Sequence, residues 1–200
     1  MTAPGTKDLR VGVLASGTGS NFQALIRAGV KVAVLVCNVP SAKCLERARA
    51  AGVEAVVLDH TIFASREAYD EALVGELKRR EVRLVCLAGF MRLLTPKFLA
   101  AFPRAVINVH PSLLPAFPGT HAAKQALDYG VKISGCTVHF VDEGTDTGPI
   151  IAQAAVPVLT TDDEATLQAR IQLEEHRLFP AVVAAYLQGR IIVQGRRVVT

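Results

Sequence analysis

Two residues able to do chemistry, Asn108 and His110, follow a short apolar run, Ala105 to Ile107. The run is typical of a buried strand, and residues two apart on an extended chain point the same way. An amide donor beside an imidazole that titrates near neutrality can polarise a carbonyl group and move a proton. The segment PSLLPAFPG that follows contains three prolines, which would stiffen the wall of a site. The structural alternative is a capping asparagine beside a core histidine.

Asp146, in the loop DEGTDTG, is a third candidate. Its carboxylate would orient His110 or raise the pKa of the imidazole if the two side chains paired. An aspartate in such a loop is, from its type and position alone, more often a solvated turn residue. Both interpretations of Asp146 stay open at this point.

A glycine-containing segment, LASGTGSNFQAL from Leu14 to Leu25, lies where a first strand should become a first helix. Glycines allow close approach of a ligand, and N–H groups at a helix start attract phosphate. Ser20 or Asn21 would cap this helix or add a side-chain donor. The third glycine of a dinucleotide fingerprint is absent, Asn38 replaces the expected ribose-binding acid, and no Walker lysine follows. The pattern favours a small phosphate ester, with a tight turn as the alternative.

Apolar runs alternate with helical patterns through the first half of the chain, which indicates an α/β fold with a parallel sheet. Tyr69, Ala72, Leu73 and Leu77 mark the buried face of one helix. The second half offers two strands that would pair antiparallel, then a long helix opened by a capping box from Thr161 to Glu164. A hairpin about Gln194 and Gly195 is expected at the end. One domain is predicted for residues 1–200.

The amino-acid composition limits the classes of function that we expect for this chain. The formal charge is +4 and the basic doublets are far apart, so we expect small anionic substrates and no nucleic acid. No apolar run has the length of a membrane helix, and the first ten residues lack the apolar core of a signal peptide. Four cysteines without a C-x-x-C pair predict buried, reduced thiols and a cytoplasmic protein. The histidines show no metal-ligand spacing, so no metal is expected.

Four motifs together resemble those of a known protein family: GTGSN, LAGFMRLL, NVHPSLLPAFPG, and DTGPIIAQ after GCTVHFV. From about Val11 to Arg190 the chain resembles the phosphoribosylglycinamide formyltransferase family, folate-dependent enzymes of purine synthesis. The resemblance implies a Rossmann-like, open, mostly parallel twisted sheet with helices on both faces and an antiparallel C-terminal portion. It also implies a ribonucleotide-phosphate half, about residues 1–105, and a folate-binding and catalytic half, about residues 106–200.

The resemblance assigns roles to individual residues. The catalytic residues would be Asn108, His110 and Asp146. The ribonucleotide would contact Gly19, Ser20, Asn21, Gln172 and Glu175, although the last two would otherwise be expected on a solvated helix face. The folate would contact Arg66, Met91, Arg92, Leu93, Leu94, Asn108, Asp142, Glu143, Gly144, Thr145 and Asp146. His139 is left without a role, as either a neighbour of the site or a buried strand residue.

The implied reaction transfers the formyl group of 10-formyltetrahydrofolate, a co-substrate, to the amine of the phosphoribosyl glycinamide. Asn108 and His110 would stabilise the tetrahedral oxyanion. Three alternatives compete: a formyltetrahydrofolate hydrolase, which usually has an extra N-terminal domain and lacks SGTGSN; a methionyl-tRNA formyltransferase, which is longer; and a non-catalytic nucleotide-binding module. A monomer or homodimer is expected, and the sequence does not specify which group carries the proton.

Overall fold

The computed structural model describes residues 9–199, which form two compact units with the boundary between Asn108 and Val109. Most of the first ten residues, interpreted above from sequence, lie outside the described part. Within residues 9–199, none of the helices combines the length and the apolar character needed to cross a membrane.

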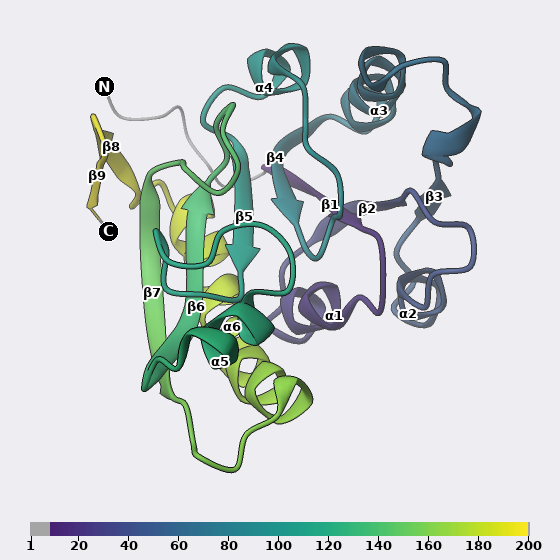
Figure 1. The fold of residues 1–200 in the computed structure, drawn as a ribbon. Coiled ribbons are helices and arrows are strands. Elements are labelled where there is room, and N and C mark those ends of the chain that lie inside the picture. Colours follow the sequence, from purple (N-terminus) through teal and green to yellow (C-terminus); the bar gives the residue numbers. More distant parts are fainter. Residues whose placement is uncertain (1–8, 200) are drawn as a thin grey trace. The chain divides into compact units, whose positions relative to one another are not determined.

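Parallel strands form the centre of the first unit (Figure 1). They are arranged in the order β3-β2-β1-β4-β5, and each neighbouring pair is parallel. Their interior positions are apolar and mostly inaccessible to solvent, as expected of strands covered on both faces. Their bounds are Arg10–Ala15 (β1), Val32–Cys37 (β2), Ala55–Val57 (β3), Val82–Leu87 (β4) and Val106–His110 (β5).

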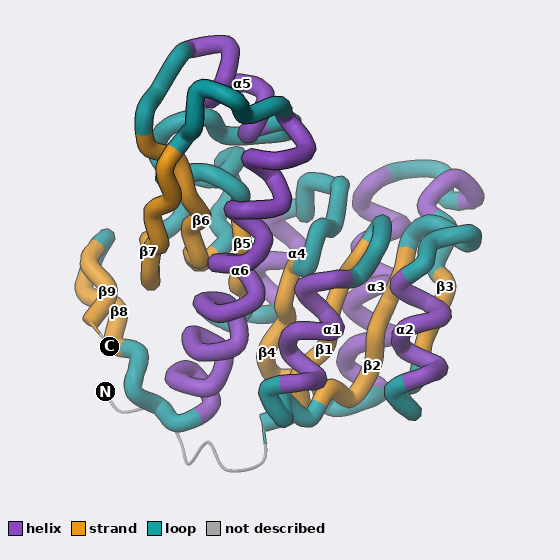
Figure 2. Tube along the Cα trace, turned by 90° about the horizontal axis from the view of Figure 1, so that it is seen from below, coloured by secondary structure: helices purple, strands orange, loops and turns teal. Residues whose placement is uncertain are grey.

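Helices cover both faces of these strands, as predicted. Helices α1 and α2 lie on one face, and α3 and α4 lie on the other (Figures 1 and 2). Tyr69, Leu73 and Leu77 of α3 are fully buried, and Ala72 is partly buried. The bounds are Ser20–Arg27 (α1), Cys44–Ala50 (α2), Arg66–Arg79 (α3) and Pro96–Ala101 (α4), with a short 3₁₀ turn, η1, at His60–Ile62.

An antiparallel pair, β6 (Ile133–Phe140) and β7 (Ile150–Pro157), forms the centre of the second unit. Helix α6 (Glu164–Leu187) packs on this pair, and α5 (Ala122–Tyr129) packs on α6. Their shared core contains Ala123, Ala126, Cys136, Ala154, Val156, Leu167 and Ile171. The chain then forms the predicted hairpin, β8 (Ile192–Gln194) and β9 (Arg197–Val199). The antiparallel C-terminal portion of the predicted fold is confirmed.

The observed N-caps of α6 and α1 differ from the two caps that the sequence predicts. Helix α6 is capped by Asp163, which forms a capping box with Thr166, so the box predicted from Thr161 to Glu164 is wrong. Asp163 is preferred because its carboxylate reaches the Thr166 N–H at 2.8 Å. Helix α1 has Gly19 as its N-cap with no side-chain cap, so neither Ser20 nor Asn21 caps it.

Candidate active site

Strand β5 positions the first two candidate residues. The register pairs Asn108 with Leu87, the last residue of β4, so Asn108 lies at the carboxyl end of the parallel strands. Ligands of open α/β sheets bind beyond this end. His110 is the last residue of β5 and is only 4 % exposed, whereas Asn108 is partly buried. The two residues share one side of an extended strand.

Asp146 is not a solvated turn residue. Its side chain is 14 % exposed, and Oδ2 lies 3.3 Å from Nδ1 of His110. The same oxygen accepts a hydrogen bond from the Gly119 N–H at 2.8 Å. The structure therefore brings Asp146 and His110 together and supports the interpretation in which the two side chains pair.

His139, which sequence reasoning left without a role, completes this cluster. It is 1 % exposed on β6, and its Nε2 lies 3.6 Å from Oδ1 of Asp146. Its Nδ1 faces the Phe140 carbonyl at 2.8 Å, much as Nε2 of His110 faces the Phe117 carbonyl at 2.8 Å. One carboxylate thus lies between two imidazoles. The signal in the sequence was a histidine within a strand of mainly apolar residues, which does not specify its neighbour.

Hydrogen bonding and burial shift the pKa of His110 in opposite directions. A carbonyl and a carboxylate can only accept, so both ring nitrogens face acceptors and a protonated ring would satisfy both. Burial disfavours that charge and is the dominant effect, which lowers the pKa of His110 although the Phe117 carbonyl and Asp146 raise it. A neutral imidazole beside two acceptors is well suited to take up a proton during a reaction.

The Asp146 carboxylate keeps its negative charge. Burial alone would raise its pKa, but hydrogen bonds from His139 and the Gly119 N–H, with the nearby imidazoles, hold the pKa below its usual value. Asp146 also has a left-handed backbone, with φ of 56°. A non-glycine residue rarely adopts this conformation, and such outliers concentrate at functional sites.

The proline-rich segment is fixed to the strands of the second unit. Thr137 Oγ1 on β6 donates to the Ser112 carbonyl at 2.7 Å and accepts from the Leu114 N–H at 3.0 Å. Gln153 on β7 donates to the Leu114 carbonyl at 2.9 Å. These bonds hold the segment that carries the Phe117 carbonyl against His110.

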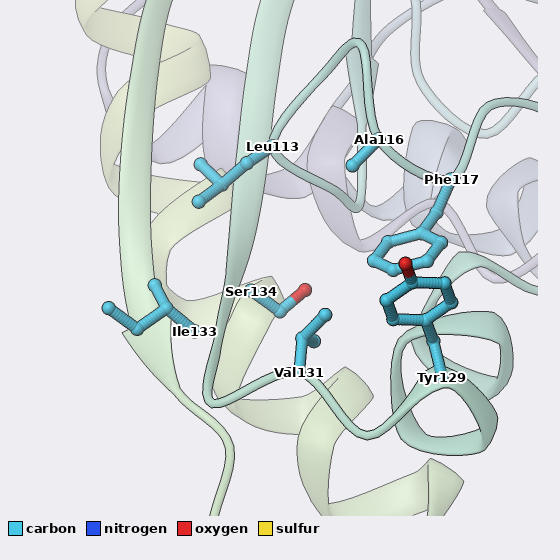
Figure 3. A pocket seen from close by; sticks show the side chains of 7 residues that line it. All are labelled: Leu113, Ala116, Phe117, Tyr129, Val131, Ile133 and Ser134. Atoms are coloured by element: carbon cyan, nitrogen blue, oxygen red, sulfur yellow. The ribbon is translucent and has the colours of Figure 1, made fainter.

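A pocket of about 460 Å³ is lined in part by this segment. Figure 3 shows the rings of Phe117 and Tyr129 facing it, with the Ser134 hydroxyl between them and Ile133. Its lining is Leu113, Ala116, Phe117, Tyr129, Val131, Ile133 and Ser134, and includes none of the three candidate catalytic residues. The lining is mainly apolar, and its polar side chains are the hydroxyls of Tyr129 and Ser134, whereas His110 and Asp146 form a cluster of ionisable groups.

The glycine segment turns into the start of α1 at Gly19. Gly19 has φ of 73° and immediately precedes Ser20 and Asn21, the first two residues of α1. N–H groups of a first helical turn point out of the helix end. A Cβ on Gly19 would lie 2.6 Å from Cβ of Cys44, so this position also needs glycine for packing.

The predicted folate residues of the first unit lie together. Arg66, the first residue of α3, donates from Nη2 to the Leu93 carbonyl at 3.2 Å. The Met91 N–H donates to Ser16 Oγ at 2.9 Å, and the Arg92 guanidinium lies 4.9 Å from the centre of the Tyr69 ring. Met91 and Leu93 are 68 % and 57 % exposed, whereas Leu94 is buried. The segment therefore presents two apolar side chains on a fixed backbone.

The remaining predicted residues belong to the second unit. In the loop 142–146, Asp142 Oδ1 accepts from the Gly144 N–H and Thr147 Oγ1, while Glu143, Gly144 and Thr145 are exposed. On α6, Gln172 is partly buried and Glu175 is 4 % exposed, so Glu175 is not on a solvated face. Within residues 9–199, no group of three or more His, Cys, Asp or Glu side chains could hold a metal ion.

Known proteins resemble this chain in sequence and in fold. Residues 9–183 match the family described as "Formyl transferase". The chain is 43 % identical over 181 residues to phosphoribosylglycinamide formyltransferase of Bacillus subtilis, covering 88 % of this chain and 93 % of the relative. A glycinamide ribonucleotide transformylase 1 crystal structure from Symbiobacterium toebii superposes with a TM-score of 0.93 at 51 % identity, covering 96 % of this chain and 93 % of that one.

Longer proteins also match. The chain is 50 % identical over 192 residues to the trifunctional purine biosynthetic protein adenosine-3 of Drosophila melanogaster, a match that covers 92 % of this chain but 14 % of the relative. The family match covers most of the chain, and the Bacillus relative is covered almost completely. The chain therefore belongs to the formyl transferase family.

Proposed function

We propose that this chain is a phosphoribosylglycinamide formyltransferase of purine biosynthesis. It would transfer the formyl group of 10-formyltetrahydrofolate to the amine of N1-(5-phospho-D-ribosyl)glycinamide, giving the N-formyl product and tetrahydrofolate. The observation that carries the proposal is the buried cluster in which Asp146 lies 3.3 Å from His110, two residues after Asn108 on β5. The names of the Bacillus and Symbiobacterium relatives support the same choice of substrate.

The substrate brings its own nucleophile, an amine, so the chain has to bind, polarise and move a proton. The amine nitrogen attacks the formyl carbon and forms a new C–N bond, and the formyl oxygen becomes an oxyanion. The Asn108 amide would donate to this oxyanion, an interaction worth about 3–4 kcal/mol in comparable sites. The positive charge of a protonated His110 would stabilise the oxyanion further. The C–N bond to the folate then breaks, and the proton lost by the amine ends on the folate nitrogen.

Asp146 would make this proton movement possible. Its negative charge favours the imidazolium form of His110 when the oxyanion develops, against the burial that keeps the resting ring neutral. His139 would act as a positioning residue, because it holds the second carboxylate oxygen. The route of the proton would run through His110, Asp146 or an ordered water.

The two substrates would bind to separate groups of residues. The phosphate would be bound at Gly19, Ser20 and Asn21, and the rest of the ribonucleotide by Gln172 and Glu175. The folate would contact Arg66, the segment 91–94 and the loop 142–146. The exposed Met91 and Leu93 side chains support an apolar surface for the pteridine.

The test is to incubate the purified chain with 10-formyltetrahydrofolate, with and without the phosphoribosyl glycinamide, and to measure both tetrahydrofolate and formylated product. We expect equal amounts of the two products, and only when the ribonucleotide is present. Tetrahydrofolate with free formate in the absence of the ribonucleotide would indicate a hydrolase, and no turnover at all would indicate a binding module. Formylation of methionyl-tRNA instead would also contradict the proposal.

Two matched substitutions locate the reaction. His110→Asn should reduce kcat by about 100-fold, the usual contribution of a proton-transfer group. His121→Asn is the control, because His121 is an exposed histidine whose imidazole lies 3.5 Å from Glu164. A His110→Asn variant with nearly parental kcat would place the chemistry elsewhere.

A further inference from the structure

Two cysteines of the first unit face each other beneath the glycine segment. Cys37 is the last residue of β2 and Cys44 is the first of α2, with the loop 38–43 between them (Figure 1). Their Sγ atoms are 3.4 Å apart, and both side chains are fully buried. Neither thiol has a part in the proposed reaction.

The two thiols are not equivalent. The Cys44 S–H donates to Cys37 Sγ, and the Val39 N–H also donates to that sulfur at 3.5 Å. The bond from Cys44 lowers the pKa of Cys37 to about 7 despite burial, and the same bond raises the pKa of Cys44. Cys86 and Cys136 differ, because burial raises the pKa of both. Cys37 is therefore the thiol that most readily provides the nucleophilic thiolate.

We propose that Cys37 and Cys44 are an oxidation site that a peroxide converts to a disulfide. The Cys37 thiolate attacks one peroxide oxygen, the O–O bond breaks, and Cys37 becomes a sulfenic acid while hydroxide leaves and takes up a proton. The Cys44 sulfur then attacks Cys37 sulfur, the S–S bond forms, and the S–O bond breaks to release water with the Cys44 proton. Two thiols are oxidised and one peroxide is reduced to two waters.

Access to the buried thiols requires only local opening of the connecting loop. Pro40, Ser41 and Lys43 in this loop are exposed, and the cysteines are only seven positions apart. Short exposed loops open far more often than the strands they connect. A small oxidant can therefore reach Cys37 without global unfolding.

A disulfide would act on the glycine segment, because Cys44 holds it in place. The Cys44 N–H donates to the Gly17 carbonyl at 3.0 Å, and Cys44 Cβ occupies the space beside Gly19. The sulfurs must close from 3.4 Å to about 2.0 Å, so the start of α2 or the end of β2 has to move. We expect oxidation to weaken ribonucleotide binding about fivefold or more, a typical coupling between sites. This consequence rests on the proposed phosphate role of Gly19, whereas disulfide formation does not.

The first experiment is independent of any activity. Trypsin cleaves after Lys43, so a disulfide would join peptides 32–43 and 44–47, which otherwise separate. We expect the joined peptide after treatment of the whole chain with hydrogen peroxide, and its loss on reduction with dithiothreitol. Cys37→Ala or Cys44→Ala should abolish it, and the control Cys136→Ala should not. Failure of the parental chain to give the joined peptide, under conditions in which its thiols react, would overturn the proposal.

The second experiment tests the consequence. Hydrogen–deuterium exchange of residues 16–23, without any ligand, should increase in the oxidised chain. Calorimetry with the phosphoribosyl glycinamide should show weaker binding to the oxidised chain than to the reduced one. Equal binding and equal exchange in the two forms would refute the coupling. A reduced chain that fails to bind the ribonucleotide would instead refute the proposed function.

Discussion

At the scale of single residues, Asp146 combines an unusual backbone, burial and two charged or ionisable contacts. Its backbone is left-handed, its carboxylate is largely buried, and each carboxylate oxygen faces an imidazole. Asparagine has the same shape and also tolerates a positive φ. An exchange to asparagine therefore removes the charge with little change to the backbone.

We predict that Asp146→Asn keeps the melting temperature within a few degrees of the parent but lowers kcat by about tenfold or more, because the charge that favours protonated His110 is lost. Measurement of kcat together with a thermal melt tests this. A parental kcat would mean that Asp146 has no catalytic role. A large fall in melting temperature would show that its role is structural.

The same variant, Asp146→Asn, should also shift the pH profile of kcat, and the sign of the shift follows from the pKa of His110. Asp146 raises the pKa of His110 against the larger effect of burial, so its removal should lower that pKa further. Activity that needs a neutral His110 as proton acceptor declines below this pKa. The acid limb of the kcat profile should therefore move to lower pH in Asp146→Asn.

At the scale of elements, the turn from β1 to α1 contains two glycines with different surroundings. Gly19 has a positive φ and approaches Cys44, whereas a Cβ on Gly17 would meet nothing within 4 Å. The two glycines therefore differ in what a side chain would cost. A substitution at Gly19 would disturb packing, so it cannot report on phosphate binding alone.

We predict that Gly19→Ala reduces the free energy of unfolding by about 2 kcal/mol or more, through the left-handed backbone and the contact with Cys44. Gly17→Ala is the matched control and should change stability by less than about 0.5 kcal/mol. Urea denaturation of both variants tests this. Equal effects in the two variants would contradict the packing argument.

In the second unit, Thr137 fixes the proline-rich segment. Thr137→Val keeps the shape of the side chain but leaves the Ser112 carbonyl and the Leu114 N–H without this hydroxyl. We predict a stability loss of about 1–3 kcal/mol and a lower kcat, because the Phe117 carbonyl would no longer be held at His110. Thr137→Ser retains the hydroxyl and should retain both properties. A serine variant as impaired as the valine variant would refute the hydrogen-bond explanation.

At the scale of the whole molecule, the fold was largely predictable from the pattern of apolar runs. Alternation of Val, Leu and Ile runs with helical segments specified the parallel strands, and the later runs specified the antiparallel pair, because burial determines both patterns. The cap of α6 was missed because two neighbouring acidic residues, Asp162 and Asp163, competed with Thr161. Local sequence does not decide such a competition.

The candidate site was only partly predictable. The i, i+2 spacing identified Asn108 and His110, since it depends on neighbours along one strand. The pairing of Asp146 with His110 and with His139 joins residues far apart in the chain, and spacing carries no such information. The same reason applies to Cys37 and Cys44, whose contact depends on how β2 connects to α2.

The pH dependence of the free energy of unfolding should reflect the protonation of the buried His110. Because the pKa of His110 is lowered in the folded chain from its ordinary 6.5, the unfolded chain takes up this proton first as the pH falls. The free energy of unfolding should therefore decrease between pH 6.5 and 5, above the range in which carboxylates titrate. Urea denaturation across this range tests the prediction, and His110→Asn should flatten the slope. An unchanged slope in that variant would assign the effect to other groups.

The segment from Met91 to Leu94 is tethered by Ser16 at Met91 and by Arg66 at Leu93, while the apolar side chains of Met91 and Leu93 are exposed. A flat ligand laid on this surface would cover hydrocarbon without having to order the chain beneath it. Association there would lose little conformational entropy and would carry a negative heat-capacity change, the thermodynamic signature of a preorganised apolar surface.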